Sequence, residues 1–138
     1  MRRNMEKKTE LERARERFKY DVYATEVTGI VIEAVADDYA KCSLRVTPSH
    51  KNAAGAVMGG VLFTLADFTF AVAANHNRPL TVTAVSQINY VGVCKGEMLF
   101  AESRLIKNGK RNCFFEITVC DDLGNTVAVV SACGTHLE

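Results

Sequence analysis

Residues 59–75 most constrain what this chain can fold into. They are apolar on nearly every side of a helical projection, and Asp67 is the only charged residue between Met58 and Asn77. A helix that is apolar all round is typical of a buried position. The polar stretch of residues 75–79, which ends in proline, stops the helix. The sequence therefore predicts one long helix enclosed by other structure.

The enclosing structure is predicted to be an antiparallel β-sheet. Asp37-Asp38 is typical of a turn between two β-rich runs, and Asn108-Gly109 is a strong signal for a hairpin between two later ones. A curved sheet wrapped around the central helix buries the helix, which gives an α+β fold class. The predicted strands are residues 29–35, 39–46, 80–91, 97–107, 111–121 and 126–136.

The start of the central helix carries a combination with chemical meaning. A glycine pair, Gly59-Gly60, opens the helix, so backbone N–H groups can approach a ligand at the positive end of the helix dipole. A lone carboxylate inside an apolar helix is costly unless something uses or satisfies it. An oxyanion site and the Asp67 carboxylate on one element together favour acyl-transfer chemistry. A purely structural Asp67, satisfied by Thr64, Thr69 or Thr83, is the alternative.

The N-terminal region differs from the rest of the chain. Residues 1–21 carry a net charge of +3 and the remaining residues a net charge of −2. We expect residues 6–20 to form a charged helix with one thin apolar stripe, packed loosely on a domain that spans residues 22–138. This balance of charge does not predict binding to nucleic acid. The predicted i,i+3 ion pairs of this helix are Glu10–Arg13, Glu12–Arg15 and Glu16–Lys19.

Other composition features exclude several classes of site. The five cysteines are odd in number and lack C-x-x-C spacing, so neither a disulfide framework nor a zinc site is expected, and a reducing cytoplasm fits best. No secretion signal or membrane span is predicted. Ser86 and Ser131 lack the partners of a serine-hydrolase triad. The histidines, His50, His76 and His136, show no metal spacing and are expected to be solvated.

The motif Asn-Ala-x-Gly-x-x-x-Gly-Gly at residues 52–60, together with the strand order and the buried helix, resembles the hotdog-fold acyl-CoA thioesterases. The phenylacetate-degradation (PaaI-like) type is the branch that the chain resembles most. The resemblance covers residues 22–138 and is most specific between Asn52 and Asp67. It implies a curved antiparallel sheet around a central helix and hydrolysis of a coenzyme A thioester.

The resemblance also implies roles for single residues. Asn52 matches an asparagine that positions water or thioester, although a local turn role is equally compatible with its sequence context. Gly59 matches the donor of the N–H that polarises the thioester carbonyl, and Asp67 matches the carboxylate that attacks or activates water. Thr83 falls where relatives place a hydroxyl beside that carboxylate. Met58 departs from the histidine of the family, and its sulfur cannot donate a hydrogen bond.

The spacing of two of these residues predicts a homodimer. Gly59 and Asp67 are eight residues apart, which is about 12 Å along one helix. A base and an oxyanion donor must both lie about 3 Å from one reacting group. Two antiparallel helices across a two-fold axis satisfy this condition, with Asn52 and Gly59 from one chain and Asp67 and Thr83 from the other. We expect a dimer as the minimum and a tetramer as the larger assembly.

The sequence thus predicts an acyl-CoA thioesterase that needs no metal and no redox cofactor. Met58 and Gly60 are further candidate substrate contacts beside the oxyanion donor. Three basic residues lie at a hairpin tip and are candidates for binding the phosphates of coenzyme A, although a solvated turn is equally compatible with them: Lys107, Lys110 and Arg111. A non-catalytic acyl-CoA-binding protein on the same fold is the main alternative, and a dehydratase is the third.

Overall fold

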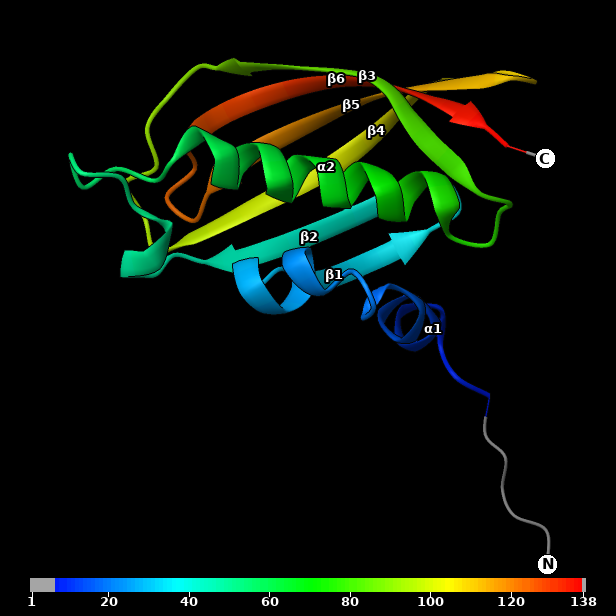
Figure 1. Cartoon of the computed structure of the whole chain (residues 1–138), viewed down its shortest axis with the longest axis horizontal. Helices are drawn as coiled ribbons and strands as arrows, with labels where there is room; N and C mark the ends of the chain where they lie inside the picture. The colour runs from blue at the N-terminus through cyan, green and yellow to red at the C-terminus, as the bar shows by residue number, and fades with distance from the viewer. Residues whose placement is uncertain (1–6, 138) are drawn as a thin grey trace, which may run out of the picture.

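Six strands form one antiparallel sheet that curves around the long helix α2 (Gly59–Asn75), as Figure 1 shows. The structure is a computed structural model and describes residues 7–137. The strands follow the spatial order β1-β2-β4-β5-β6-β3, so β1 and β3 are the two edges. Their bounds are β1 Val31–Ala36, β2 Tyr39–Arg45, β3 Thr81–Tyr90, β4 Met98–Asn108, β5 Asn112–Asp121 and β6 Thr126–His136.

The predicted α+β architecture is confirmed, including the bounds of the central helix and all six strands to within two residues. Two short elements were not expected: a π-helical turn η1 (Tyr23–Thr28) and a 3₁₀ turn η2 (Pro48–His50). The turn between β1 and β2 uses Asp38 with a φ of 59°, a conformation that aspartate adopts more readily than most residues.

Burial of α2 against the concave face of the sheet builds the core. Leu65, Ala66 and Ala73 are fully buried. The ring of Phe70 meets Phe115 of β5 edge-on, with 5.5 Å between the centroids. One strip of the helix remains at least partly open to solvent, and it includes Gly60, Phe63, Thr64, Asp67 and Ala71. The expectation of a buried helix therefore holds for all but this strip.

The N-terminal helix α1 (Glu10–Phe18) starts later than expected because Thr9 caps it. The Thr9 hydroxyl accepts from the N–H of Glu12 at 3.0 Å, and the Glu12 carboxylate accepts from the N–H of Thr9 at 2.9 Å, which is a capping box. The expected loose packing is wrong, since Ala14 and Phe18 are buried in the common core. The Phe18 ring contacts Phe68 of α2 edge-on at 6.2 Å.

Two of the three predicted ion pairs in α1 are confirmed. Glu10–Arg13 is 2.9 Å and Glu16–Lys19 is 2.8 Å. The third, Glu12–Arg15, is wrong because both side chains have other partners. Glu12 completes the capping box, and the Arg15 guanidinium donates to the carbonyl of Ile32 on β1 at 2.9 and 2.6 Å.

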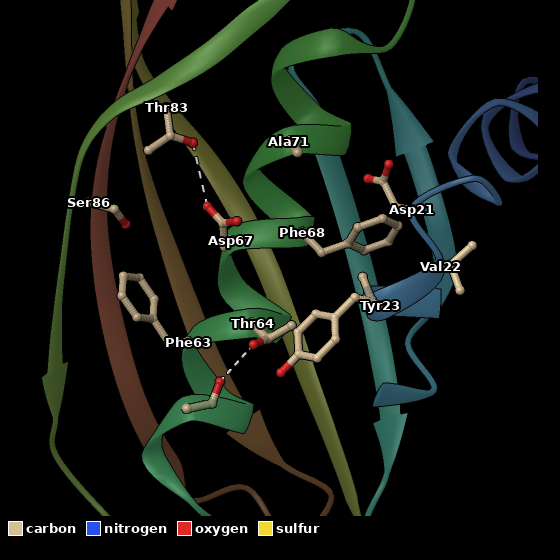
Figure 2. A pocket seen from close by; sticks show the side chains of 12 residues that line it. Asp21, Val22, Tyr23, Phe63, Thr64, Asp67, Phe68, Ala71, Thr83 and Ser86 are labelled. Atoms are coloured by element: carbon tan, nitrogen blue, oxygen red, sulfur yellow. Dashed lines mark hydrogen bonds between the residues drawn. The ribbon is translucent and has the colours of Figure 1, made fainter. Parts of the chain in front are cut away.

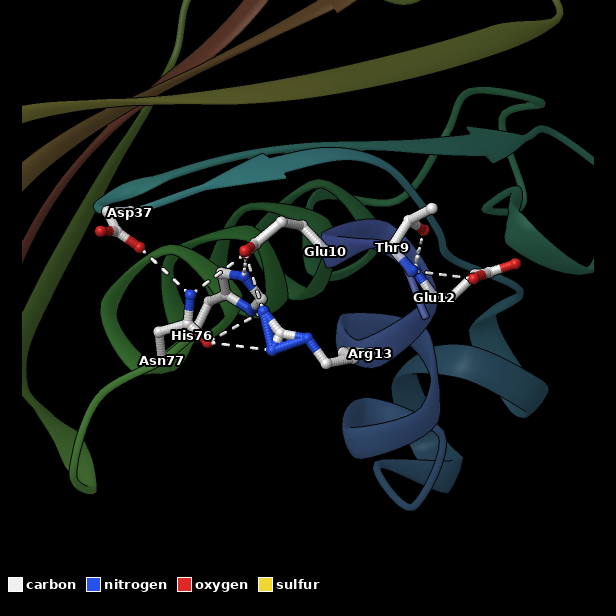
Figure 3. Close-up of polar contacts among 7 residues, drawn as sticks. All are labelled: Thr9, Glu10, Glu12, Arg13, Asp37, His76 and Asn77. Carbon is white, nitrogen blue, oxygen red and sulfur yellow. Dashed lines mark hydrogen bonds and ion pairs between the residues drawn. The ribbon is translucent and has the colours of Figure 1, made fainter. Parts of the chain in front are cut away.

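A polar cluster attaches α1 to the C-terminal end of α2 (Figure 3). The buried His76 ring is hydrogen-bonded through Nε2 to the carboxylate of Glu10. Asn77 donates to the same carboxylate at 3.1 Å and accepts from Arg13 at 3.3 Å. Arg17 donates to the carbonyl of Asn75 at 2.5 Å. This carbonyl lies at the C-terminal end of α2, where the helix dipole stabilises a positive charge. These contacts hold helix α1, which precedes η1, against the end of α2.

The expectation of solvated histidines is wrong for two of the three. His76 is 2% exposed and His50 is 7% exposed. His50 Nε2 bonds to the carbonyl of Thr28 at 2.8 Å, and its Nδ1 accepts from the N–H of Thr47 at 3.0 Å. Both rings thus serve as polar links between segments, a role that satisfies their nitrogens inside the fold.

Neither a membrane-spanning helix nor a cluster of metal ligands is found in residues 7–137. This part of the chain contains no helix long and apolar enough to span a lipid bilayer. Over the same residues, no group of three or more histidine, cysteine, aspartate or glutamate side chains is arranged to hold a metal ion.

The Glu10 cluster predicts a specific acid sensitivity. The hydrogen bond from His76, and then the Arg13 guanidinium, lower the pKa of Glu10 from 4.5 to about 2. Because the folded-state pKa lies below the unfolded-state value, this stabilisation is complete above about pH 4.5 and is lost as the pH falls toward 2. We expect the urea midpoint of the wild type to fall more steeply over this range than that of Glu10→Gln. Glu26→Gln, a change outside the cluster, should retain the wild-type slope, and parallel curves for Glu10→Gln would contradict the prediction.

Candidate functional site

A cavity of about 790 Å³ lies between α2, β3 and the segment that enters η1 (Figure 2). Its wall is largely apolar, with a few polar groups placed among the rings, which is the usual composition of a small-molecule site. The lining residues are Asp21, Val22, Tyr23, Ala24, Gly60, Phe63, Thr64, Asp67, Phe68, Ala71, Thr83 and Ser86.

Asp67 is the carboxylate of α2 that faces β3 across this cavity. The Thr83 hydroxyl donates to Asp67 Oδ1 at 3.5 Å, a long hydrogen bond that places the two predicted site residues side by side. The carboxylate keeps contact with solvent on the cavity side, yet desolvation by the surrounding walls raises its pKa above the ordinary 3.8. The Thr83 hydroxyl lowers this pKa, and the negative charge of Asp21 raises it. The Asp67 carboxylate is thus open to the cavity and is a stronger base than an ordinary aspartate.

A β-bulge in β3 determines which side chains face Asp67. Thr83 pairs with Gly134, whereas the next paired residue is Val85 with Cys133, so Ala84 is the extra residue. Residues three apart on a regular strand point to opposite faces. The bulge removes this alternation, and both Thr83 and Ser86 therefore face α2. Bulges are frequent beside active sites because they redirect a side chain in this way.

Ser86 is a cavity residue that sequence reasoning set aside. Its hydroxyl oxygen is shielded from solvent and has no hydrogen-bond partner among residues 7–137. A shielded hydroxyl without a partner is unusual in a folded protein, because it loses its hydrogen bonds to water. The sequence offered no sign of this placement, because strand alternation alone would put Ser86 on the face opposite to Thr83.

The first turn of α2 presents free backbone donors. Met58 occupies the N-cap position, and its side chain makes no capping hydrogen bond. The N–H groups of Gly59 and Gly60 have no acceptor among the described residues, whereas those of Val61 and Leu62 bond to the carbonyl of Met58. The first N–H groups of a helix carry its partial positive charge. This end of α2 can therefore bind a negatively charged or carbonyl oxygen.

Asn52 organises the loop that precedes the helix. Its side-chain oxygen accepts from the N–H groups of Ala54 at 2.9 Å and Ala56 at 3.0 Å. Gly55 completes the turn with a φ of +85°, which a residue with a side chain adopts only under strain. These contacts match the local turn role that the sequence left open for Asn52. They leave its proposed contact with water or substrate as a prediction.

The structure gathers some of the predicted site residues around one cavity and leaves others apart. Asp67, Thr83 and Gly60 line the cavity, whereas Asn52, Met58 and Gly59 lie at the N-terminal end of α2 and do not line it. The basic hairpin tip lies at the opposite end of the molecule, near the C-terminus (Figure 1). Its residues are Lys107, Lys110 and Arg111.

Lys110 lines a separate cavity of about 350 Å³, with Arg78 and His136 in its wall. The single chain therefore does not place the hairpin cations beside Asp67. Phosphate binding by Lys107, Lys110 and Arg111 stays a prediction.

The segment Asp21–Ala24 was missed as part of the site. It forms the cavity wall on the far side of α2 from β3, and Tyr23 points its ring along the helix toward Thr64 (Figure 2). Val22 is 49% exposed and Tyr23 is 65% exposed, which is high for apolar side chains. The sequence signal for this wall is the aromatic and apolar run directly after the charged helix.

Comparisons with known proteins agree with this architecture. Residues 54–128 match the family model described as Thioesterase superfamily. A putative esterase of Archaeoglobus fulgidus is 31% identical over 94 residues, which cover 67% of this chain. The match spans 61% of the length of that relative, which is less than two thirds.

Solved structures share the fold at low sequence identity. The PaaI protein of the phenylacetic acid degradation operon of E. coli has a TM-score of 0.81 at 22% identity, over 93% of this chain and 96% of that one. A hypothetical thioesterase of Streptococcus pneumoniae, solved with coenzyme A, has a TM-score of 0.80 at 22% identity, over 89% and 96%. These matches confirm the predicted hotdog fold.

Proposed function

Because the chain belongs to the thioesterase superfamily, we propose that it hydrolyses an acyl-CoA thioester to the free acid and coenzyme A. The observation that carries this proposal is the Asp67 carboxylate, which faces a largely apolar cavity and has a raised pKa and a hydroxyl partner in Thr83. The coenzyme A complex of the S. pneumoniae thioesterase supports the choice of a coenzyme A thioester as the ligand.

The proposed chemistry uses the ionised form of Asp67. The carboxylate either attacks the thioester carbon, giving an anhydride that water then hydrolyses, or removes a proton from a water that attacks directly. In both routes the carbonyl oxygen gains negative charge, which the Gly59 N–H stabilises, and the coenzyme A thiolate leaves. A raised pKa favours the proton-transfer route by bringing the base closer to the working pH. Oxygen-18 from labelled water, found in Asp67 after a single turnover, would identify the anhydride route.

We propose that the complete site needs two chains. Gly59 and Asp67 belong to the same helix and are about 12 Å apart along its axis. The partly open strip of α2, which includes the apolar Phe63, lies beside β3, whose outer edge has no strand next to it within residues 7–137. A two-fold partner there would cover apolar surface and bring its own Gly59 toward Asp67. A tetramer built from two such dimers stays a prediction.

A non-catalytic acyl-CoA-binding protein is the second candidate. The side chain of Met58, at the N-cap of α2, is 49% exposed and offers no hydrogen bond to substrate where the family has histidine. Tight binding of acyl-CoA without release of thiol by the wild type would favour this candidate over hydrolysis.

Replacement of the carboxylate tests the proposal directly. We expect Asp67→Asn to lower the rate of thiol release from acyl-CoA by about 10² or more, because the amide can neither attack nor accept a proton. The measurement is thiol release from a panel of short, medium, long and aryl acyl-CoAs. Equal rates in both proteins would remove Asp67 from the chemistry.

Mixed dimers test whether each site is shared between two chains. Gly59→Pro removes the proposed oxyanion N–H; the proline backbone suits the first position of a helix, and its ring displaces the Tyr90 side chain, which lies 2.9 Å from a Cβ atom at this position. Co-expressed Asp67→Asn and Gly59→Pro chains should recover about a quarter of the wild-type activity, because half of the dimers then contain one intact site of two. No recovery, with mixed dimers shown to be present, would place each site within one chain.

The hydroxyl of Thr83 predicts the pH dependence of hydrolysis. The ionised carboxylate is the active form, so kcat/KM should fall as the pH drops through the raised pKa of Asp67. Thr83→Val removes a donor that lowers this pKa, so the acid limb should move to higher pH. Thr83→Ser should keep the limb in place. A limb that does not move in Thr83→Val would show that this hydroxyl does not tune Asp67.

A further inference from the structure

The side chain of Tyr90, at the end of β3, covers the first residue of α2. Its hydroxyl donates to the carbonyl oxygen of Gly59 at 3.2 Å. A Cβ atom at residue 59 would lie 2.9 Å from Tyr90 Cζ and 3.0 Å from its hydroxyl oxygen. The ring therefore occupies the space that a side chain at position 59 would need.

This contact gives a reason for glycine at position 59. The backbone there is not in the left-handed region, so another residue could adopt its conformation without strain. Gly60, by contrast, has no atom within 4 Å of the position of an added Cβ. The missing Cβ of Gly59 thus makes room for Tyr90, in addition to any approach of a ligand to the backbone.

The hydroxyl of Tyr90 acts on the peptide group that carries a free donor. The Gly59 carbonyl and the Gly60 N–H belong to the same peptide unit, and this N–H has no acceptor among the described residues. A hydrogen bond to the carbonyl polarises the N–H of the same unit and makes it a stronger donor. Thr64 donates similarly to the Gly60 carbonyl at 2.8 Å, but that peptide carries the N–H of Val61, which already bonds to Met58.

Tyr90 itself is held by the sheet. It pairs with Ala128 of β6, and the N–H groups of Val91 and Gly92 both bond to the carbonyl of Val127, at 3.0 and 3.2 Å. The ring is 54% exposed, so its position depends on this backbone and on the contact with Gly59. The side chain of Tyr90 therefore connects the start of α2 to the sheet.

We propose that Tyr90 is a positioning residue for the oxyanion site. It holds the peptide between Gly59 and Gly60 so that the free N–H of Gly60 points at the thioester carbonyl, beside the N–H of Gly59. The inference rests on the proposed thioesterase function. It adds to that function a residue that does not line the cavity and carries no charge.

The test is Tyr90→Phe, which keeps the ring and removes the hydroxyl. We expect kcat for the best acyl-CoA substrate to fall about fivefold to tenfold, with KM and the melting temperature nearly unchanged. Tyr39→Phe is the matched control, because it removes a tyrosine hydrogen bond to Glu102 in β4, away from the cavity. The control should retain the wild-type kcat.

A double-mutant cycle identifies the partner of Tyr90. Gly59→Ala keeps the backbone N–H but displaces the ring, so Tyr90→Phe should change kcat by less than about twofold in that background. An effect of Tyr90→Phe that is equally large in both backgrounds would overturn the inference. An unchanged kcat in the single variant, or a fall in kcat that follows loss of dimer, would also overturn it.

A readout without turnover separates this inference from the proposed function. The amide proton of Gly60 should change its NMR chemical shift in Tyr90→Phe and keep it in Tyr39→Phe, because only the first change releases the Gly59 carbonyl. This shift is expected even if the wild type hydrolyses no thioester, which would refute the proposed function alone. An unmoved Gly60 amide would overturn the role of Tyr90.

Discussion

Burial of α2 against the concave face of the sheet is the constraint on which the rest of the structure depends. The helix is apolar on almost every side, so the sheet curves around it. Helix α1 covers part of the helix surface that the sheet leaves open. Only the strip around Asp67 stays partly open. The same packing that stabilises the fold thus leaves one carboxylate at the wall of a cavity, with its pKa raised by the surfaces that confine it.

The fold was predictable because its signals are local. The apolar run of α2, the Asp37-Asp38 turn and the Asn108-Gly109 hairpin each specify an element through chemistry within a few residues. The start of α1 was predicted too early, at residue 6, although the spacing of Thr9 and Glu12 is that of a capping box and indicates a start at Glu10. The close packing of α1 was not readable, because a stripe as thin as Ala14 and Phe18 does not reveal which surface will cover it.

The candidate site was predictable only where one motif holds it. Asp67 and Gly59 lie on a single helix, and the resemblance placed Thr83 beside the carboxylate. Ser86 and Tyr90 were not recognised because their placement depends on strand register. A bulge at Ala84 turns Ser86 toward α2, and the end of β3 brings Tyr90 over Gly59. The bulge arises in the pairing of β3 with β6, which are distant in the sequence, and a shift of one residue moves each following side chain to the other face of the sheet.

The two edge strands of the sheet differ in what covers them, and this difference limits how copies of the chain can pair through their sheets. Helix α1 lies alongside β1, and Arg15 donates hydrogen bonds to the carbonyl of Ile32. By contrast, β3 has no strand beside its outer edge within the described chain. A sheet open at both edges can add copies without end and form fibres. A sheet open at one edge can be extended by one copy, after which both outer edges are covered. Because helix α1 covers the β1 edge, an assembly formed by pairing of sheet edges would end at two copies.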